Sequence, residues 1–230
     1  MIEVKLIHPI DEDLKFFNKY IDDIQKKYPE IVEIVKLEDN EMSHNEALKI
    51  IEDSYTNTII VFLCHGGSNY INGCRYFYSD EKTDIQFDYQ ILHGHFIDES
   101  NLNILINKKV LFVSCHSGLS LVKKVVENGA NHCIGFKELI FDDLNKIRNI
   151  EDCNENIVRY VEDTFANLLF KSISQLIENN ITFTQLTDYL KLLINKECDE
   201  IILNSKPEGF YRKANALNDI KDGITLFSHD

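Results

Sequence analysis

The fold of this chain is decided by residues 108–121, KKVLFVSCHSGLSL. Two lysines lead into an apolar run that ends at a cysteine, a histidine and a glycine turn, after which an apolar-periodic segment resumes. Residues 58–67, TIIVFLCHGG, have the same design and end on His65 and two glycines. Short apolar runs rich in β-branched residues and bounded by turn residues are typical of buried strands. The sequence therefore predicts two buried strands that each end on reactive side chains.

Other apolar runs extend this pattern into an α/β fold. Further strand-like runs are EVKLIHPI (3–10), HCIGF (132–136) and, with less regular alternation, IVEIVKL (31–37). The patterns between these runs are helical, at residues 11–27, 41–53, 99–107 and 118–128. Buried strands that alternate with helices indicate βαβ units. We therefore expect a three-layer αβα fold with a mostly parallel central sheet.

The remaining segments predict a hairpin and a helical C-terminal region. Residues 68–92 alternate aromatic and polar side chains around an Asn-Gly pair, which is typical of a hairpin. After residue 150, apolar residues recur at intervals of three and four, which predicts a long helix. A second helix is expected from Thr182 to near Lys196, followed by irregular structure with one closing strand at GITLF (223–227). We expect one domain over residues 1–230, with a C-terminal helical extension over 154–230.

Composition narrows the classes of partner and the compartment. The chain has 230 residues, 44% hydrophobic content and a formal net charge of −14. Such a charge argues against nucleic acid and anionic membrane surfaces as partners. The first residues alternate apolar and charged side chains, so we expect no signal peptide, and no apolar window is long enough to span a membrane. The six cysteines lack the density of a disulfide scaffold, so we expect reduced thiols in a cytoplasmic protein.

Reactive side chains follow two of the predicted strands. In parallel sheets, ligands gather where loops converge at the carboxyl ends of the strands. His65 and Cys115 occupy such positions, and an imidazole beside a thiol is what a thiol nucleophile and its base require. Gly66 and Gly67 would let backbone N–H groups point at a developing oxyanion, with the Cys115 N–H as a second donor. A helix starting at Gly118 would favour the Cys115 thiolate.

These features resemble the caspase-like cysteine peptidases. A strand ends in His-Gly, and about fifty residues later another ends in a cysteine followed by a glycine turn. The glycine comes three residues after the cysteine, as in the CHAT-type branch, whereas caspases have it two residues after. Similar segments surround this core, over roughly residues 55–180: FIDESNLNILINKKVLFVSC (96–115), NGANHCIGFKELIFDD (128–143) and FANLLFKSI (165–173).

The resemblance implies a caspase-haemoglobinase-like fold and a cysteine endopeptidase that needs no cofactor. His65 would be the general base and Cys115 the nucleophile, while backbone groups of Gly66 and Cys115 would form the oxyanion hole. Related branches cleave after basic residues, which implies an acidic specificity pocket at Asp142 or Asp143, with Glu138 as a further candidate. The expected partner is a protein or peptide substrate, and a single dedicated protein is one candidate. The resemblance also implies a bacterial peptidase of stress or antiviral defence that a partner or ligand regulates.

The residues leave other interpretations open. Cys64 and His116 adjoin the proposed pair and present the opposite residue types, so these two could exchange roles. Alternation along a strand instead predicts that Cys64 packs in the core, while His116 lies in the turn and contacts substrate. A Ser117 hydrolase is disfavoured because the flanking glycines of a nucleophile elbow are missing. A catalytically silent interaction module remains open. So does a zinc site, built from a larger set of candidate ligands: Cys64, His65, His93, His95, Cys115 and His116.

Overall fold

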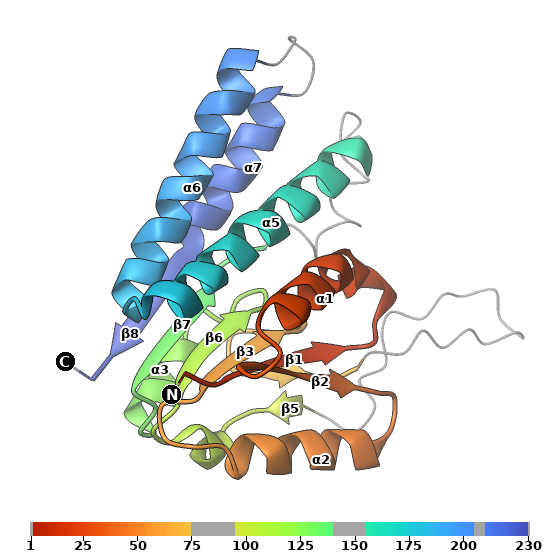
Figure 1. Ribbon diagram of the computed structural model, residues 1–230, viewed down its shortest axis with the longest axis vertical. Helices are drawn as coiled ribbons and strands as arrows, with labels where there is room; N and C mark the ends of the chain where they lie inside the picture. The colour runs from red at the N-terminus through yellow and green to blue at the C-terminus, as the bar shows by residue number, and fades with distance from the viewer. Residues whose placement is uncertain (1, 75–94, 140–154, 205–209, 230) are drawn as a thin grey trace, which may run out of the picture.

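A computed structural model shows a six-stranded central sheet and describes residues 2–74, 95–139, 155–204 and 210–229 (Figure 1). The strand order is β2-β1-β3-β6-β7-β8. The first five strands of this order run parallel, and β8 is antiparallel to β7. Their bounds are Val4–Pro9 for β1, Val32–Leu37 for β2, Ile59–Leu63 for β3, Lys109–Val113 for β6, His132–Phe136 for β7 and Ile224–Ser228 for β8.

Helices cover both faces of the sheet. One face packs against the 3-10 helix η1 (Glu12–Phe17), α1 (Asn18–Lys27) and the long α5 (Glu155–Asn179). The other face packs against α2 (Glu41–Glu52), the 3-10 turn η2 (Leu102–Leu105) and α3 (Leu121–Glu127). We name these the α5 face and the α2 face. This arrangement confirms the expected three-layer αβα fold.

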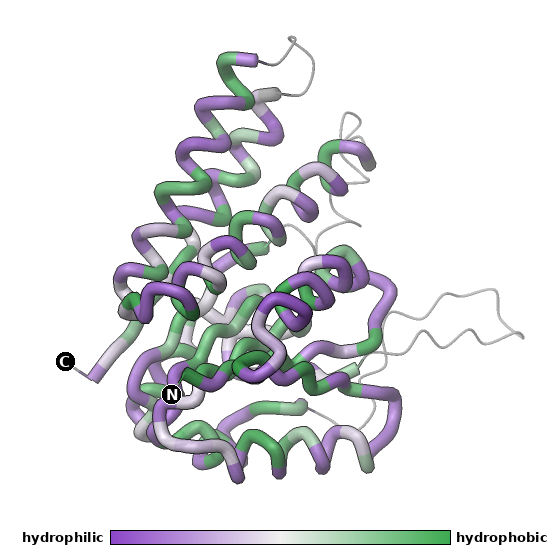
Figure 2. Tube along the Cα trace, viewed as in Figure 1, coloured by the Kyte–Doolittle hydropathy of each residue, from purple (hydrophilic) through white to green (hydrophobic). Residues whose placement is uncertain are grey.

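The two central strands are buried along their whole apolar length. Every residue of β3 is buried, as are the last four residues of β6. Figure 2 shows these strands as mostly apolar, whereas the outer helices alternate apolar and polar positions. Side chains of successive strand residues point to opposite faces, so Val61 and Leu63 join the α5 face while Ile60 and Phe62 join the α2 face. The same alternation orients the residues that follow each strand.

The C-terminal region is more helical than expected. The second expected helix continues to the end of α6 (Phe183–Asn204), beyond Lys196. Residues 210–223, expected to be irregular, form α7 (Phe210–Gly223). Three buried side chains, Ala214, Leu217 and Ile220, lie at three-residue intervals on its inner face. Proline and glycine just before this helix hid the periodicity. The expected closing strand is confirmed as β8, and α7 and α6 pack side by side beyond α5 (Figure 1).

Two other expectations were wrong in detail. The helix expected over 118–128 begins at Leu121, and the segment expected over 99–107 contains only the short η2. Of the hairpin expected over 68–92, the structure describes only the start, where β4 (Ile71–Asn72) pairs antiparallel with β5 (His95–Ile97), a strand beyond the expected range. Residues 75–94 lie outside the described part. None of the described helices is long and apolar enough to cross a membrane.

Candidate active site

The site lies where β3 and β6 end at the same edge of the sheet. These strands are parallel neighbours, and their last paired residues are Leu63 and Val113. His65 and Cys115 each follow two residues later. Because side chains alternate, both continue the direction of Leu63 and Val113, toward the α5 face. Cys115 packs in the same cluster as these two residues.

The two chain segments remain adjacent after the strands end. A Cβ added to Gly66 would lie 3.0 Å from Ser114 Oγ and 2.9 Å from the Tyr70 carbonyl oxygen. Further on, the Ser120 hydroxyl donates a hydrogen bond to the Ser68 carbonyl. Only glycine allows such a close approach between the two turns at position 66. The segments that carry His65 and Cys115 therefore stay adjacent to one another, as β3 and β6 do.

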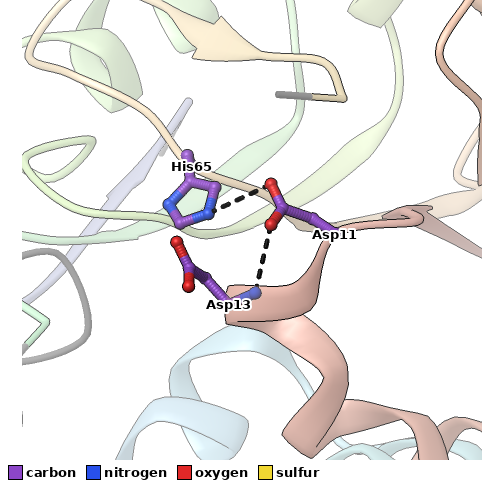
Figure 3. Close-up of side chains that lie close together, drawn as sticks. All are labelled: Asp11, Asp13 and His65. Atoms are coloured by element: carbon purple, nitrogen blue, oxygen red, sulfur yellow. Dashed lines mark hydrogen bonds and ion pairs between the residues drawn. The ribbon is translucent and has the colours of Figure 1, made fainter. Parts of the chain in front are cut away.

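His65 faces two aspartates that the sequence analysis did not assign to the site (Figure 3). Its Nε2 lies 3.5 Å from Asp11 Oδ2, and the side chains are 4% and 1% exposed. One ligand atom each of Asp11, Asp13 and His65 lies within 4.8 Å of the others. Asp11 comes just after β1, the other parallel neighbour of β3, and its place at the end of a strand-like run was the signal for it in the sequence.

The aspartates come from the start of η1. Asp11 has an extended backbone, and its side chain accepts a hydrogen bond of 3.1 Å from the Asp13 N–H, which is N-capping. Glu162, on α5, is half-buried and lies close enough to Asp13 for the two carboxylates to interact electrostatically. Burial raises the pKa of Glu162 to about 7, Asp13 adds to this rise, and Arg159 opposes it. Asp11 and Asp13 therefore lie beside His65, and Glu162 interacts electrostatically with Asp13.

Cys115 is almost inaccessible to solvent in this structure. The residue is 4% exposed, and its Sγ donates a hydrogen bond of 3.1 Å to the carbonyl of Leu139, just beyond β7. The expected helix N-terminus at Gly118 is absent, because α3 begins at Leu121 and has only seven residues. The expectation that this helix lowers the pKa of the Cys115 thiol is therefore withdrawn. Gly118 has a different function, since a Cβ there would lie 2.8 Å from the Phe136 backbone.

Cys64 and His116 are poorly placed to exchange roles with the proposed pair. Cys64 is buried on the α2 face, where its Sγ contacts the Ile7 carbonyl at 3.8 Å. Burial raises the pKa of its thiol well above the usual value, and Asp11 and Cys74 raise it further. Such a thiol is a poor nucleophile. His116 is exposed and has a φ of 60°, so it lies in a turn as expected. The expected burial of Cys64 is confirmed.

An acidic pocket lies beside the Cys115 turn. It has a volume of about 320 Å³ and is lined by His116, Leu119, Lys137, Glu138, Asp219, Asp222 and Gly223. Burial raises the pKa of Asp219, and the neighbouring carboxylates of Glu138 and Asp222 raise it further. Of the predicted specificity residues, Glu138 is therefore in a pocket near the site. Asp142 and Asp143 lie outside the described residues. The α7 aspartates were missed because that segment was expected to be irregular.

The predicted zinc ligands that the structure describes are not gathered into one group. Within the described part of the chain, the group suited to a metal ion is Asp11, Asp13 and His65, which contains no cysteine. Two carboxylates and an imidazole at this spacing are compatible with a divalent cation. His93 lies outside the described residues. The described cysteines (Cys64, Cys74, Cys115, Cys133 and Cys198) are all buried and form no disulfide.

Comparison with known proteins assigns no function to this chain, so its function has to be argued from the geometry of the site. No protein-family model, curated protein or solved structure matches the chain.

Proposed function

We propose that this chain is a caspase-like, CHAT-type cysteine endopeptidase with His65 as general base and Cys115 as nucleophile. The observation that carries the proposal is the register of β3 and β6. Leu63 pairs with Val113, so an imidazole and a thiol follow at equal distance along neighbouring parallel strands, and both turn toward the α5 face. A thiol and a base placed together at the carboxyl edge of a sheet are suited to acyl transfer.

The reaction would proceed through an acyl-enzyme. His65 accepts the Cys115 proton as sulfur attacks the scissile carbonyl carbon, and the carbonyl oxygen becomes an oxyanion. Backbone N–H groups of Gly66 and Cys115 are the proposed donors to this oxyanion. The C–N bond then breaks, and imidazolium returns the proton to the leaving amine. Water, deprotonated by His65, attacks the thioester, so a carboxylic acid and the free thiol are released.

The structure has the features of a resting state. Cys115 is nearly inaccessible, and its S–H donates to the Leu139 carbonyl. A thiolate cannot donate this bond and would face the carbonyl oxygen, so the contact favours the unreactive thiol. Moving the Leu139 carbonyl away from the sulfur would remove this preference. This supports regulation by a partner or ligand that displaces Leu139.

The same closure favours a second candidate function, a catalytically silent interaction module. In such a module, Cys115 would be a buried apolar residue whose thiol satisfies a carbonyl. The two candidates differ in the chemistry of the sulfur. A silent module has no need of an imidazole that alters the reactivity of Cys115, whereas a peptidase requires one.

The preferred substrate of the proposed peptidase has a basic residue before the scissile bond. Support comes from the pocket beside His116, which contains the carboxylates of Glu138, Asp219 and Asp222 and one lysine, Lys137. A cationic side chain would relieve the repulsion among these carboxylates, which contributes to the raised pKa of Asp219. Charge-assisted bonds of this kind discriminate Lys and Arg from neutral side chains.

The test is digestion of a proteome-derived peptide library by the wild-type chain and by Cys115→Ala, with cleavage sites identified by mass spectrometry. We expect cleavage after Lys or Arg that the variant lacks. Glu138→Gln and Asp219→Asn should each reduce kcat/KM on basic substrates about tenfold, the loss of one charge-assisted hydrogen bond, and leave neutral substrates unchanged. Cleavage that persists in Cys115→Ala would contradict the nucleophile assignment, and cleavage after other residues would contradict the acidic pocket.

A further inference from the structure

We propose that Asp11, Asp13 and His65 bind one divalent transition-metal ion, which competes with the proposed peptidase reaction for His65. The binding site stands by itself, whereas the competition rests on the proposed function. Asp11 comes just after β1, His65 just after the neighbouring β3, and Asp13 from the first turn of η1. Figure 3 shows the three side chains turned toward one another, and one ligand atom of each lies within 4.8 Å of the others.

The spacing of Asp11 Oδ2 and His65 Nε2 suits two ligands of one ion. These atoms lie 3.5 Å apart, which is longer than the usual range of an N–H···O hydrogen bond. Two ligand atoms that are each about 2.1 Å from a tetrahedral Zn²⁺ lie about 3.4 Å from one another. An ion shared by the carboxylate and the imidazole would therefore leave their spacing almost unchanged.

The Asp11 carboxylate is held with one oxygen on the side of His65. Its Oδ1 accepts the Asp13 N–H at 3.1 Å, and its Oδ2 is the atom that faces the imidazole. The Asp11 and His65 side chains are 1% and 4% exposed. Because both are already fixed and withdrawn from water, ion binding has little ordering to impose on them. Asp13 is half-buried, so its carboxylate can adjust to complete the coordination.

The ligand types and the surrounding charge favour a divalent transition metal. Imidazole nitrogen suits Zn²⁺ and its neighbours in the first transition row, whereas Mg²⁺ and Ca²⁺ prefer sets made only of oxygen. Glu162 of α5 interacts electrostatically with Asp13 and adds negative charge, which Arg159 partly offsets. Three protein ligands leave a coordination position for water, as in open zinc sites.

A cavity beside Asp11 gives an ion a route to the group. Its volume is about 340 Å³, and its lining comes from β1, η1, α1 and β2. The charged residues around it are Asp11, Glu12, Lys15, Asp22 and Lys36. Glu12 and Lys15 form an ion pair with each other at 2.6 Å. A site whose ligands are nearly closed to solvent requires such an entry path.

A filled site and an active dyad exclude one another. A ring nitrogen whose lone pair is on a metal cannot accept a proton, and the ion holds the imidazole in place. His65 therefore cannot act on Cys115 while the ion is bound, and release of the ion returns the base to the reaction. Metal binding would thus inhibit the proposed peptidase through its histidine.

The test uses Co²⁺ as the probe, on chain freed of metal with a chelator. Calorimetric titration gives the stoichiometry and affinity without substrate. Absorbance identifies the ligands, because Co²⁺ bound to thiolate has an intense sulfur-to-metal charge-transfer band in the near ultraviolet. Asp13→Asn removes one ligand and keeps the backbone N–H that Asp11 caps. Glu12→Gln, an exposed charge loss between the two aspartates, is the matched control.

We expect one Co²⁺ per chain without a thiolate band, bound at least about tenfold more weakly by Asp13→Asn. Glu12→Gln should bind Co²⁺ as the wild-type chain does. Wild-type chain that does not bind Co²⁺ would overturn the inference. So would equal affinity in Asp13→Asn, or a thiolate band, which would place the ion at a cysteine.

Peptide cleavage with and without Co²⁺ tests the competition. Saturating Co²⁺ should abolish cleavage by the wild-type chain, and Asp13→Asn should require about tenfold more of it. Cleavage that continues with the site saturated would overturn the competition. Metal-free chain that cleaves no peptide would refute the proposed function and the competition with it, and the metal site would stand on the binding data.

Discussion

Two Cys-His dipeptides follow neighbouring strands of the sheet, Cys64-His65 after β3 and Cys115-His116 after β6, and their side chains lie in opposite environments. In the first dipeptide, the cysteine is buried on the α2 face, and the histidine turns toward Asp11 on the α5 face. In the second, cysteine is buried on the α5 face and histidine is exposed in a turn.

The difference between them comes from a one-residue offset in register. Leu63 pairs with Val113, so Cys64 is level with Ser114, and His65 is level with Cys115. Because side-chain direction alternates, a shift by one residue would exchange the faces of both residues. Identical dipeptides can therefore supply a base from one strand and a nucleophile from the next. The predictions below test whether the two dipeptides differ as this account requires.

The largest expected effects separate the two members of each dipeptide. We expect Cys115→Ala and His65→Ala each to abolish peptide cleavage while the Tm stays within a few degrees, because each removes a group that reacts. Cys64→Ala and His116→Ala are the matched variants on the same two turns. Cys64→Ala should retain the activity and lose about 1 kcal/mol of stability, the cost of truncating a small buried side chain. His116→Ala should retain at least a tenth of kcat. Loss of turnover in Cys64→Ala, with its fold intact, would reverse the assignment.

The next effect concerns the glycine turn after the second dipeptide. Gly118 N–H donates to the Phe136 carbonyl, and a Cβ would lie 2.8 Å from the backbone of that residue. Backbone cannot move aside as a flexible side chain can, so Gly118→Ala should lower the free energy of unfolding by about 2 kcal/mol. Gly223→Ala is the control, since its nearest contact is 3.4 Å. Urea denaturation would measure both, and equal stabilities would contradict the close approach.

The smallest effect concerns Glu162, which interacts electrostatically with Asp13 beside His65. Burial raises the pKa of Glu162 from 4.5 to about 7, so the folded chain binds this proton more tightly than the unfolded chain. Stability therefore falls as pH rises from about 4.5 to about 7, where the folded carboxyl ionises. Because the side chain is partly exposed, Glu162→Gln should stabilise the chain by only about 1 kcal/mol at pH 8.

At pH 4 this gain should disappear, since the wild-type carboxyl is then largely protonated in both states. Denaturation curves at several pH values would measure the difference. Glu200→Gln, an exposed change on α6, should show no such dependence. A gain for Glu162→Gln that is constant with pH would mean that burial does not raise the pKa of Glu162.

The sequence predicted the parts of this site that depend on strand pattern. Apolar runs identified β3 and β6, and alternation placed Cys64 in the core. Register between strands is a tertiary property, so the alignment of His65 with Cys115 required the structure. The approach of Asp11 depends on β1 lying beside β3, and no local pattern encodes the neighbours of a strand. The closure of Cys115 by the Leu139 carbonyl likewise joins segments that are distant in sequence.

Part of the fold was missed for local reasons. Residues 116–120 separate Cys115 from the start of α3, because Gly118 approaches the Phe136 backbone and no cap starts a helix there. At the C-terminus, α7 has a polar outer face and buries only one side, against α5 and α6. Its apolar spacing is too sparse to outweigh the proline and glycine that precede it.

The most direct test of the central claim is covalent capture of the nucleophile. The wild-type chain would be treated with a peptidyl acyloxymethyl ketone that carries lysine next to the reactive group, and the modified residue would be located by tandem mass spectrometry. The account predicts a single adduct on Cys115 among the six cysteines, absent in His65→Ala and retained in His116→Ala. An adduct on Cys64, or labelling of Cys115 that does not depend on His65, would contradict it.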